Sequence, residues 1–397
     1  MAAIAVVVLD TVRRDAFDEY FDWLPGRWFE RAYSTSHRTV PAHASLFTGT
    51  YAGEIGVGGG NEHLTFDGRT LAERLGDAGY TTRAFSANPY VSGQFGYDRG
   101  FQHFDGGWRL RACDPAVFDW GVFISNTHGE GPSRYLKGLW RCLRSDCDTY
   151  RSLKHGATLK RYDSGLGPLA IDDGASAALE MVRATDFGDE EFLFVNLMEA
   201  HAPYNPPDSR QSAEQAGFDG VRATVTGTSG VDAAGRRGRY DDSVRYLAAV
   251  YRDIFDELRS QFDVVITLSD HGELFGEHGA WNHCYGVFPE LTHVPLVVTG
   301  DGAVTGADDG TGEGDGTGDG PTVHDETVVS LLDVHRTVLE LAGVDGESRG
   351  RHLLRNPPGA TVLTECHGLT PRHYDRLATE DVPQARLESF ANPVYGL

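Results

Sequence analysis

Short apolar segments that end in polar residues alternate with helical patterns along this chain. A pattern with one apolar face covers Leu71–Leu75 and, at greater length, Tyr240–Gln261. Strands that alternate with helices are typical of α/β proteins with a mostly parallel central sheet and helices on both faces. We therefore predict that architecture, with strands at Ile4–Leu9, Thr82–Ser86, Phe192–Leu197, Val264–Leu268 and Val294–Val298.

Two segments break this alternation. The first, Gly300–Gly320, is acidic, rich in glycine and without a residue that anchors a core, which predicts a flexible surface loop. A calcium-binding repeat is the alternative interpretation, although the spacing of its residues is irregular.

The second segment is a basic helix over residues 133–145, within an insertion that covers about 107–165. Basic residues recur at helical spacing opposite a set of apolar ones. Two interpretations stay open: a solvated helix whose charges face acidic neighbours, or a surface that contacts an anionic substrate, anionic lipid or a partner. The basic residues are Arg134, Lys137, Arg141 and Arg144, and the apolar ones are Tyr135, Leu136, Leu139, Trp140 and Leu143.

The chain has 397 residues and a formal net charge of −23. Only three of its 35 basic residues are lysines, namely Lys137, Lys154 and Lys160. An acidic surface almost without lysine resembles proteins of salt-loving archaea, so we expect a halophilic protein; an ordinary acidic enzyme is the alternative. A strongly negative chain is a poor match for nucleic acid, and we predict none as a partner. The composition does not indicate the oligomeric state.

No segment has the run of about 18 apolar residues that spans a bilayer, so we predict no transmembrane segment. The apolar start of the chain has no basic region before it and ends at Asp10, which favours a buried strand and a cytoplasmic protein over a secretory signal. The five cysteines are irregularly spaced and fit neither a disulfide framework nor a zinc ribbon.

Candidate chemistry follows two of the predicted strands. Asp10 comes directly after Ile4–Leu9, and Asp270-His271 follow Val264–Leu268. In parallel sheets such positions meet in the crevice beyond the carboxyl ends of the strands. Two carboxylates and an imidazole can hold a divalent cation, and a cation beside Thr39 would activate its otherwise unreactive hydroxyl.

The segments around Asp10, Thr39 and Asp270-His271, together with several further motifs, resemble the alkaline phosphatase superfamily, and most closely its sulfatase-like branch. The match extends over residues 4 to 355 and rests on the order of several motifs rather than on any one of them. They are Asp10–Asp15, Thr39–Tyr51, Thr70–Leu75, Ala78–Tyr80, His201–Tyr204, Ser269–Glu273, Gly276–His283, Val294–Leu296 and Ser330–Gly343.

The resemblance implies roles for single residues. The metal ligands would be Asp10, Thr39, Asp270 and His271, with Thr39 as the nucleophile. His201 and His283 would bind the transferred group or protonate the leaving oxygen, and Arg13 would neutralise the anion. His43 would bind substrate. Glu199 is a candidate for either a further ligand or a group behind the ligands, and a structural role stays open for His201 and His283.

This chain departs from true sulfatases at the nucleophile. Those enzymes carry Cys or Ser there, followed by x-Pro-Ser-Arg, and oxidise it to formylglycine; here the segment is Thr39-Val40-Pro41-Ala42-His43. A threonine cannot become the aldehyde without losing its methyl group, so we expect no formylglycine. The segment is similar to the nucleophile of nucleotide pyrophosphatase/phosphodiesterases. Their second metal needs an Asp where this chain has Asn196 or Leu197, which implies one divalent ion: Mn, Zn, Ca or Mg.

We therefore predict a metal-dependent hydrolase of phosphate or phosphonate esters, with sulfate esters less favoured, that acts through a covalent Thr39 intermediate. The substrate would be a small anionic ester or a glycan. Two alternatives are a transferase that moves a phospho- or sulfo-group to a glycan or lipid head group, and a degenerate protein that only binds anions or glycans. Residues 1–355 would form the catalytic domain and 356–397 a short C-terminal segment.

Overall fold

The computed structural model describes all residues other than 1, 115, 121–122, 125–126, 128–130, 132, 165–171, 208–217, 229, 301–321, 356–360 and 381. The predicted acidic loop falls almost wholly on 301–321, outside the described residues. Ten strands are β1 (Ile4–Leu9), β2 (Arg27–Tyr33), β3 (Thr81–Ser86), β4 (His103–Gly106), β5 (Glu191–Leu197), β6 (Val264–Leu268), β7 (Leu296–Gly300), β8 (Val323–Ser330), β9 (Thr364–Cys366) and β10 (Val394–Gly396).

Eight of these strands form one sheet in the order β4-β3-β5-β1-β6-β7-β2-β8, and β9 pairs with β10 in a small separate sheet. From β4 to β6 neighbouring strands are parallel, whereas β7 runs antiparallel to both β6 and β2. The predicted mostly parallel α/β fold is confirmed. The principal described helices are α1 (Arg14–Tyr20), α2 (Thr39–Thr48), α3 (Leu71–Asp77), α5 (Ser133–Arg144), α6 (Thr149–Ser164), α7 (Ala175–Ala184), α9 (Gly220–Thr226), α10 (Ala233–Arg259), α11 (Pro289–Thr292), α13 (Leu331–Leu341), α14 (Pro371–Thr379) and α15 (Gln384–Ala391).

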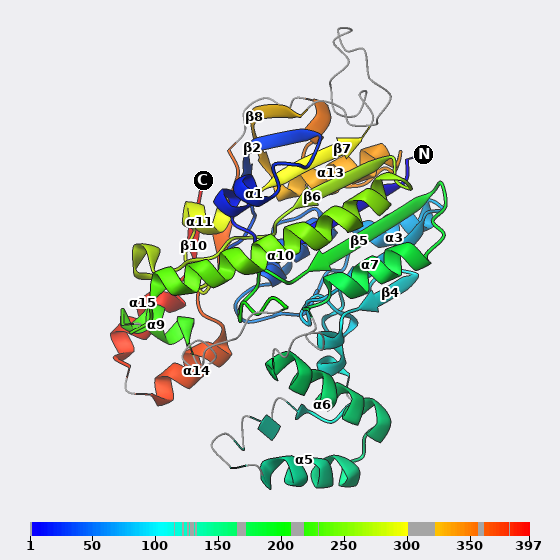
Figure 1. Ribbon diagram of the computed structural model, residues 1–397. Helices are drawn as coiled ribbons and strands as arrows, with labels where there is room; N and C mark the ends of the chain where they lie inside the picture. The colour runs from blue at the N-terminus through cyan, green and yellow to red at the C-terminus, as the bar shows by residue number, and fades with distance from the viewer. Residues whose placement is uncertain are drawn as a thin grey trace.

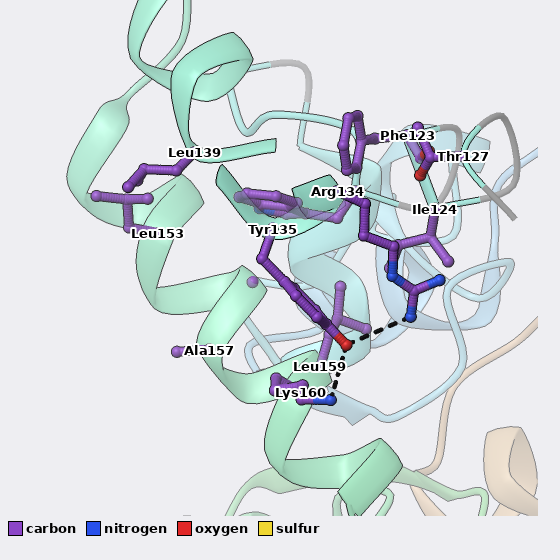
Figure 2. A pocket seen from close by; sticks show the side chains of 12 residues that line it. Phe123, Ile124, Thr127, Arg134, Tyr135, Leu139, Leu153, Ala157, Leu159 and Lys160 are labelled. Atoms are coloured by element: carbon purple, nitrogen blue, oxygen red, sulfur yellow. Dashed lines mark hydrogen bonds between the residues drawn. The ribbon is translucent and has the colours of Figure 1, made fainter. Parts of the chain in front are cut away.

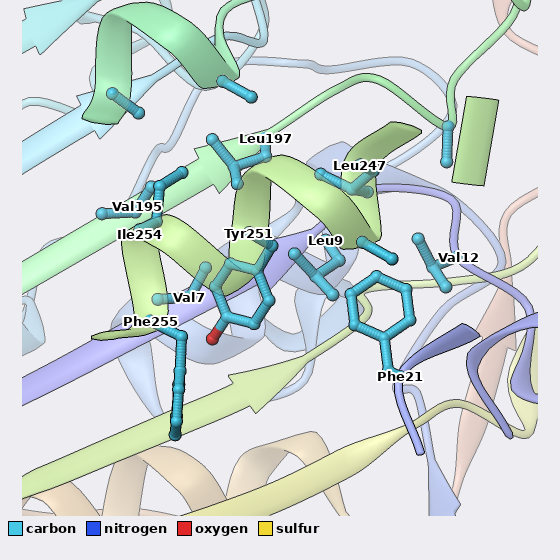
Figure 3. Close-up of a cluster of buried hydrophobic side chains, with 14 of the residues drawn as sticks. Val7, Leu9, Val12, Phe21, Val195, Leu197, Leu247, Tyr251, Ile254 and Phe255 are labelled. Carbon is cyan, nitrogen blue, oxygen red and sulfur yellow. The ribbon is translucent and has the colours of Figure 1, made fainter. Parts of the chain in front are cut away.

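Helices cover both faces of the large sheet, and alternate side chains of its central strand therefore enter two different cores. Val7 and Leu9 of β1 pack with α1, α7 and α10, and the 27-residue α10 runs along this face (Figure 1). Val6 and Val8 lie in the other core, with α2, α3 and α13. Figure 3 shows the first core, where Tyr251 of α10 lies among residues of β1 and β5. A strand buried on both faces needs the unbroken apolar sequence seen here.

Strand predictions were close where apolar residues are continuous and poorer elsewhere. The strand expected at Val294–Val298 begins two residues later, at Leu296, because Pro295 has no N–H to donate to a ladder. The long helix begins at Ala233, ahead of the predicted Tyr240, after a cap in which the Asp232 side chain accepts a hydrogen bond from the Ala234 N–H. Strand β2 was not predicted, since Arg27, Glu30 and Arg31 interrupt its apolar residues.

Candidate functional site

The carboxyl ends of β1 and β6 bring Asp10, Asp270 and His271 together. The two strands are parallel neighbours with Val8 opposite Leu268, so the residues that follow them leave the sheet at the same edge. All three side chains are completely buried. One potential ligand atom of each lies within 4.8 Å of the others.

The donor atoms of this cluster fit a divalent cation. His271 donates from Nδ1 to the Gly272 carbonyl oxygen at 2.9 Å, which leaves the Nε2 lone pair facing the carboxylates, 3.5 Å from Asp270 Oδ2. Asp270 Oδ2 is buried and has no hydrogen-bond partner among the residues that the structure describes. Burial and the neighbouring Asp10 raise the pKa of Asp270 well above its usual range. A cation would satisfy the orphan oxygen, and two carboxylates with one imidazole suit Mn, Zn or Mg.

Two residues hold the carboxylates in place, a role that the sequence did not assign to either of them. Thr11 donates its hydroxyl to Asp10 Oδ1 at 2.7 Å and its N–H to Asp270 Oδ1 at 3.2 Å. It does so from a backbone φ of 69°, which is strained for a β-branched residue and typical of functional positions. Asn88, just beyond β3, donates to Asp10 Oδ2 at 2.8 Å. Its position after a parallel strand was the signal that would have found it.

Thr39 is the first residue of α2, and its hydroxyl lies against the cluster. Its Oγ1 is 3.1 Å from His271 Nε2. The residue also lines a cavity of about 340 Å³, together with His201 and His283. The structure thus brings the expected nucleophile, metal ligands and two histidines into one place. A helix N-terminus additionally favours an anion at this position.

The two histidines present the same ring atom to the cavity. His201 donates from Nδ1 to the Ala202 carbonyl at 2.7 Å, and His283 donates from Nδ1 to Glu273 Oε1 at 3.1 Å, so Nε2 of each is left for substrate. The His283 ring lies 5.0 Å from His201 and 4.5 Å from His271, centroid to centroid. Burial, His271 and His201 hold the pKa of His283 well below its usual value, so its imidazole is neutral.

Glu273 is the group behind His283, and it belongs to the Ser269–Glu273 motif, in which the sequence predicted no role for it. Its carboxylate is completely buried and accepts the Tyr204 hydroxyl on Oε2 at 2.7 Å while Oε1 faces His283. A buried carboxylate on Nδ1 fixes the tautomer of an imidazole and stabilises its protonated form. Glu273 is therefore a positioning residue for His283.

His43 does not lie where a substrate-binding residue would be. Its side chain is fully buried, donates from Nδ1 to the Thr39 carbonyl at 2.9 Å and accepts on Nε2 from the Asn196 amide at 3.2 Å. Burial lowers its pKa to about 4, so the ring is neutral. His43 supports the Thr39 backbone from beneath the cluster instead of contacting substrate.

Arg13 also lies away from the cavity. Its guanidinium binds Asp15 at 2.9 Å and Glu277 at 2.8 Å, and donates to the Glu273 carbonyl at 3.0 Å. It lines a different surface pocket beside α1, with Glu290 and His293. Because these carboxylates neutralise it, Arg13 is not placed to bind the anion.

Arg38 occupies the position that Arg13 was expected to fill. It directly precedes Thr39 and lines the same cavity. Its Nε and Nη2 atoms are buried, and the described part of the chain supplies no hydrogen bond or ion pair to its guanidinium. Burial lowers the pKa of this arginine, yet arginine stays charged in proteins. The residue is half-buried at the cavity wall, and two of its guanidinium nitrogens lack hydrogen bonds among the described residues, so this guanidinium is suited to an anionic ligand.

Residues from distant segments complete the cavity wall. The C-terminal segment contributes Thr370 and His373, and the start of the 107–165 insertion contributes Arg109. Glu199 is outside the cluster: its Oε1 accepts the Ala175 N–H of α7 at 2.6 Å. Burial and the nearby Asp172 and Asp173 raise its pKa to about 8, so it supports α7 and is not a ligand.

A family model and several solved structures are similar to this chain. A family model described as Sulfatase matches residues 24–344. Phosphonate monoester hydrolases of Agrobacterium radiobacter and Silicibacter pomeroyi are 18% and 16% identical, with TM-scores of 0.62 and 0.65. The alignments cover 94% and 100% of this chain, and 83% and 85% of those proteins.

A third structure is the C-terminal periplasmic domain of the phosphoethanolamine transferase EptC from Campylobacter jejuni. It is 15% identical, with a TM-score of 0.50 over 90% of this chain and 96% of that domain. At such identities these likenesses concern the fold alone. No curated protein matches the sequence significantly.

Proposed function

Since the chain belongs to the sulfatase family, we propose that it is a metal-dependent hydrolase of phosphate or phosphonate esters that works through a covalent Thr39 intermediate. The observation that carries this proposal is the Thr39 hydroxyl, 3.1 Å from His271 Nε2 beside two buried carboxylates and at the wall of a cavity with two more histidines. The similarity to two phosphonate monoester hydrolases supports the choice of substrate class.

The chain's own groups would divide the work as follows. Asp10, Asp270, His271 and Thr39 would hold one divalent cation, which when bound lowers the pKa of an alcohol and offsets negative charge on the ester. Arg38 and the N-terminus of α2 bind the non-bridging oxygens of the ester. Orientation of those oxygens places the phosphorus opposite Thr39 Oγ1.

In the first step Thr39 Oγ1 forms a bond to phosphorus as the bond to the leaving oxygen breaks. The threonine proton passes to Nε2 of His283 or His201 and from there to the leaving oxygen, so charge and protons balance. Glu273 stabilises the imidazolium that forms on His283 in between. In the second step the oxygen of a water molecule bonds to phosphorus as the bond to Oγ1 breaks, and one proton of that water passes through the histidine to Thr39 Oγ1.

A threonine ester has no second hydroxyl with which to expel the transferred group, unlike the formylglycine hydrate of sulfatases. Hydrolysis must therefore come from water, whose attack on phosphorus is assisted by the same histidines. This chemistry favours phosphate and phosphonate monoesters or diesters over sulfate esters as substrates.

Transfer to an alcohol is the second candidate, and the similarity to the EptC domain favours it. The two candidates differ only in what attacks the Thr39 ester. Product analysis by mass spectrometry with added alcohols or glycerol separates them, because a hydrolase gives free phosphate and no new ester.

The test is a panel of aryl phosphate monoesters, diesters, phosphonates and sulfates, each assayed with Mn, Zn, Mg or Ca at several salt concentrations. Thr39→Ala should lower kcat/KM by about 10³-fold or more while the protein still takes up metal. Acid-quenched wild-type protein should carry phosphate on Thr39. Wild-type rates in Thr39→Ala would reject the covalent Thr39 intermediate. No turnover of any ester with any metal would reject the enzyme in favour of an anion-binding protein.

A further inference from the structure

Helices α5 and α6 form a basic lobe, Ser133–Ser164, that projects from the sheet (Figure 1). Helix α5 is the outermost element of this end of the molecule. Ten large apolar side chains of the described chain are exposed, and most of them belong to the lobe or the segment leading into it. Those seven are Ile124, Tyr135, Leu136, Leu139, Trp140, Leu143 and Tyr150.

Helix α5 packs against the rest of the lobe through one side, and its exposed apolar side chains lie on the other side. Gly138 and Cys142 are buried, and a Cβ at Gly138 would meet Phe123 at 2.8 Å, so only glycine allows this close approach. The outward ridge is formed by Leu136, Trp140 and Leu143, which are 74%, 55% and 56% exposed. Apolar surface of this kind on a packed helix marks an interaction site.

The lobe also reverses the charge of the protein. Between Ser133 and Arg161 there are eight basic and two acidic residues, in a chain of net charge −23, and all three lysines lie here. One basic side chain lies directly against the ridge: the Arg144 guanidinium is 4.7 Å from the centroid of the Trp140 ring. A positive patch on a negative protein orients it so that this face meets an anionic surface first.

A pocket of about 210 Å³ lies beside the ridge, between α5 and α6. Figure 2 shows Arg134 and Lys160 converging on the Tyr135 hydroxyl, and their donor nitrogens lie 3.3 and 3.1 Å from its oxygen. Two cations at the mouth of an apolar pocket match a phosphate group followed by methylene carbons. The apolar lining includes Phe123, Ile124, Leu139, Leu153 and Leu159.

We propose that the outer face of the basic lobe binds the surface of an anionic phospholipid bilayer. The ridge enters the interface between head groups and acyl chains, where Trp and Leu are favoured, while the flanking Arg and Lys bind head-group phosphates. Among the described residues no helix is long and apolar enough to cross a membrane. Nucleic acid would use the charges but not the ridge. The inference does not depend on the chemistry at Thr39.

The experiment is co-sedimentation of the full chain with vesicles of phosphatidylcholine alone or mixed with phosphatidylglycerol, from low to molar potassium chloride. Wild-type protein should bind the mixed vesicles and not the neutral ones, most strongly at low salt. Lys137→Gln/Arg141→Gln/Arg144→Gln should weaken binding by about a hundredfold, and Trp140→Ser/Leu143→Ser by at least tenfold.

Matched controls separate this face from the general surface. Arg183→Gln/Arg245→Gln/Arg252→Gln removes as many charges from α7 and α10, and Tyr395→Ser removes an exposed aromatic ring elsewhere; both should bind as wild type. Unchanged melting temperatures exclude misfolding of the variants. Wild-type protein that stays in the supernatant at every salt concentration overturns the proposal. So does vesicle binding that the lobe variants do not reduce, or a wild-type dimer that Trp140→Ser/Leu143→Ser dissociates while no vesicle is bound.

Discussion

Folded proteins usually bury apolar side chains and expose charged ones, and two regions of this molecule do the reverse. They are the cluster around Thr39 and the basic lobe. The cluster buries charge: Asp10 and Asp270 are completely shielded from solvent, and two guanidinium nitrogens of Arg38 are buried without a hydrogen bond from the described residues. The lobe exposes apolar surface at Leu136 and Trp140. Each arrangement costs stability in the free protein. Under the two proposals a ligand would remove that cost: an ion and an anionic ester at the cluster, and a bilayer at the lobe.

The two regions are also built differently. Thr11 and Asp270, which bond in the cluster, are 259 residues apart in sequence, whereas Tyr135 and Lys160 of the lobe are 25 apart. A site assembled from distant strand ends depends on the whole sheet. A helical pair held by local contacts can change its outer face without disturbing the core. The four predictions that follow test this contrast.

The largest effect is expected at Asp270. Asp270→Asn removes one of two facing carboxylates, so it should abolish metal uptake and lower activity by about 10³-fold or more. In metal-free protein the same change relieves repulsion from Asp10 and should raise the melting temperature by about 5 °C. Thermal melts with and without a chelator measure both effects. A chelator that lowers the melting temperature of Asp270→Asn as much as that of wild type would contradict the proposed metal site.

Arg38→Gln comes next. Loss of a charged partner for the ester should lower kcat/KM by about 10- to 100-fold, mostly through KM. Because the lost nitrogens Nε and Nη2 have no hydrogen bonds among the described residues, the melting temperature of the free protein should not fall. Arg13→Gln is the matched control: it breaks two ion pairs, so it should lower the melting temperature and leave KM unchanged. Equal effects of the two variants on KM would show that Arg38 has no special role.

A smaller effect concerns pH and Glu199. Its pKa of about 8 in the folded chain lies above the 4.5 of an unperturbed glutamate, so the native state retains a proton that the unfolded state releases. Wild-type stability should fall as pH rises from about 4.5 to 8 through this group, and Glu199→Gln should remove that contribution. Melting temperatures should therefore diverge by a few degrees in favour of the variant at pH 8 and converge at pH 5. If the melting temperatures of the two proteins differ by the same amount at every pH, Glu199 does not cause the fall in stability.

The smallest effect is expected in the lobe. Trp140→Ser/Leu143→Ser should change the free energy of unfolding by no more than about 0.5 kcal/mol and leave turnover of a soluble ester unchanged, because neither side chain packs in the core. Urea unfolding and a solution assay measure this. A loss of several kcal/mol would mean that the ridge is structural, and the contrast between the two regions would disappear.

Much of the fold was readable from the sequence where burial is uniform. Strands β1 and β6 have the predicted bounds, Ile4–Leu9 and Val264–Leu268, because both lie at the centre of the sheet and are apolar throughout. The basic helix was also predicted from its periodicity alone. Strand β2 was not predicted, since it lies towards the edge of the sheet between β7 and β8, where polar side chains are tolerated.

The sequence by itself indicated that Asp10 and Asp270-His271 meet, because polar residues that directly follow buried parallel strands share one edge of the sheet. That the two strands are neighbours came from the structure. Only the tertiary structure decided which arginine, Arg13 or Arg38, faces the cavity. Arg13 is neutralised by Glu277, which lies 264 residues away in sequence, whereas no carboxylate in the described chain binds Arg38. It likewise buried His43, placed Glu273 behind His283 and brought His373 from the C-terminal segment. The charge and exposure of a side chain depend on what packs against it, and distant segments supply those neighbours.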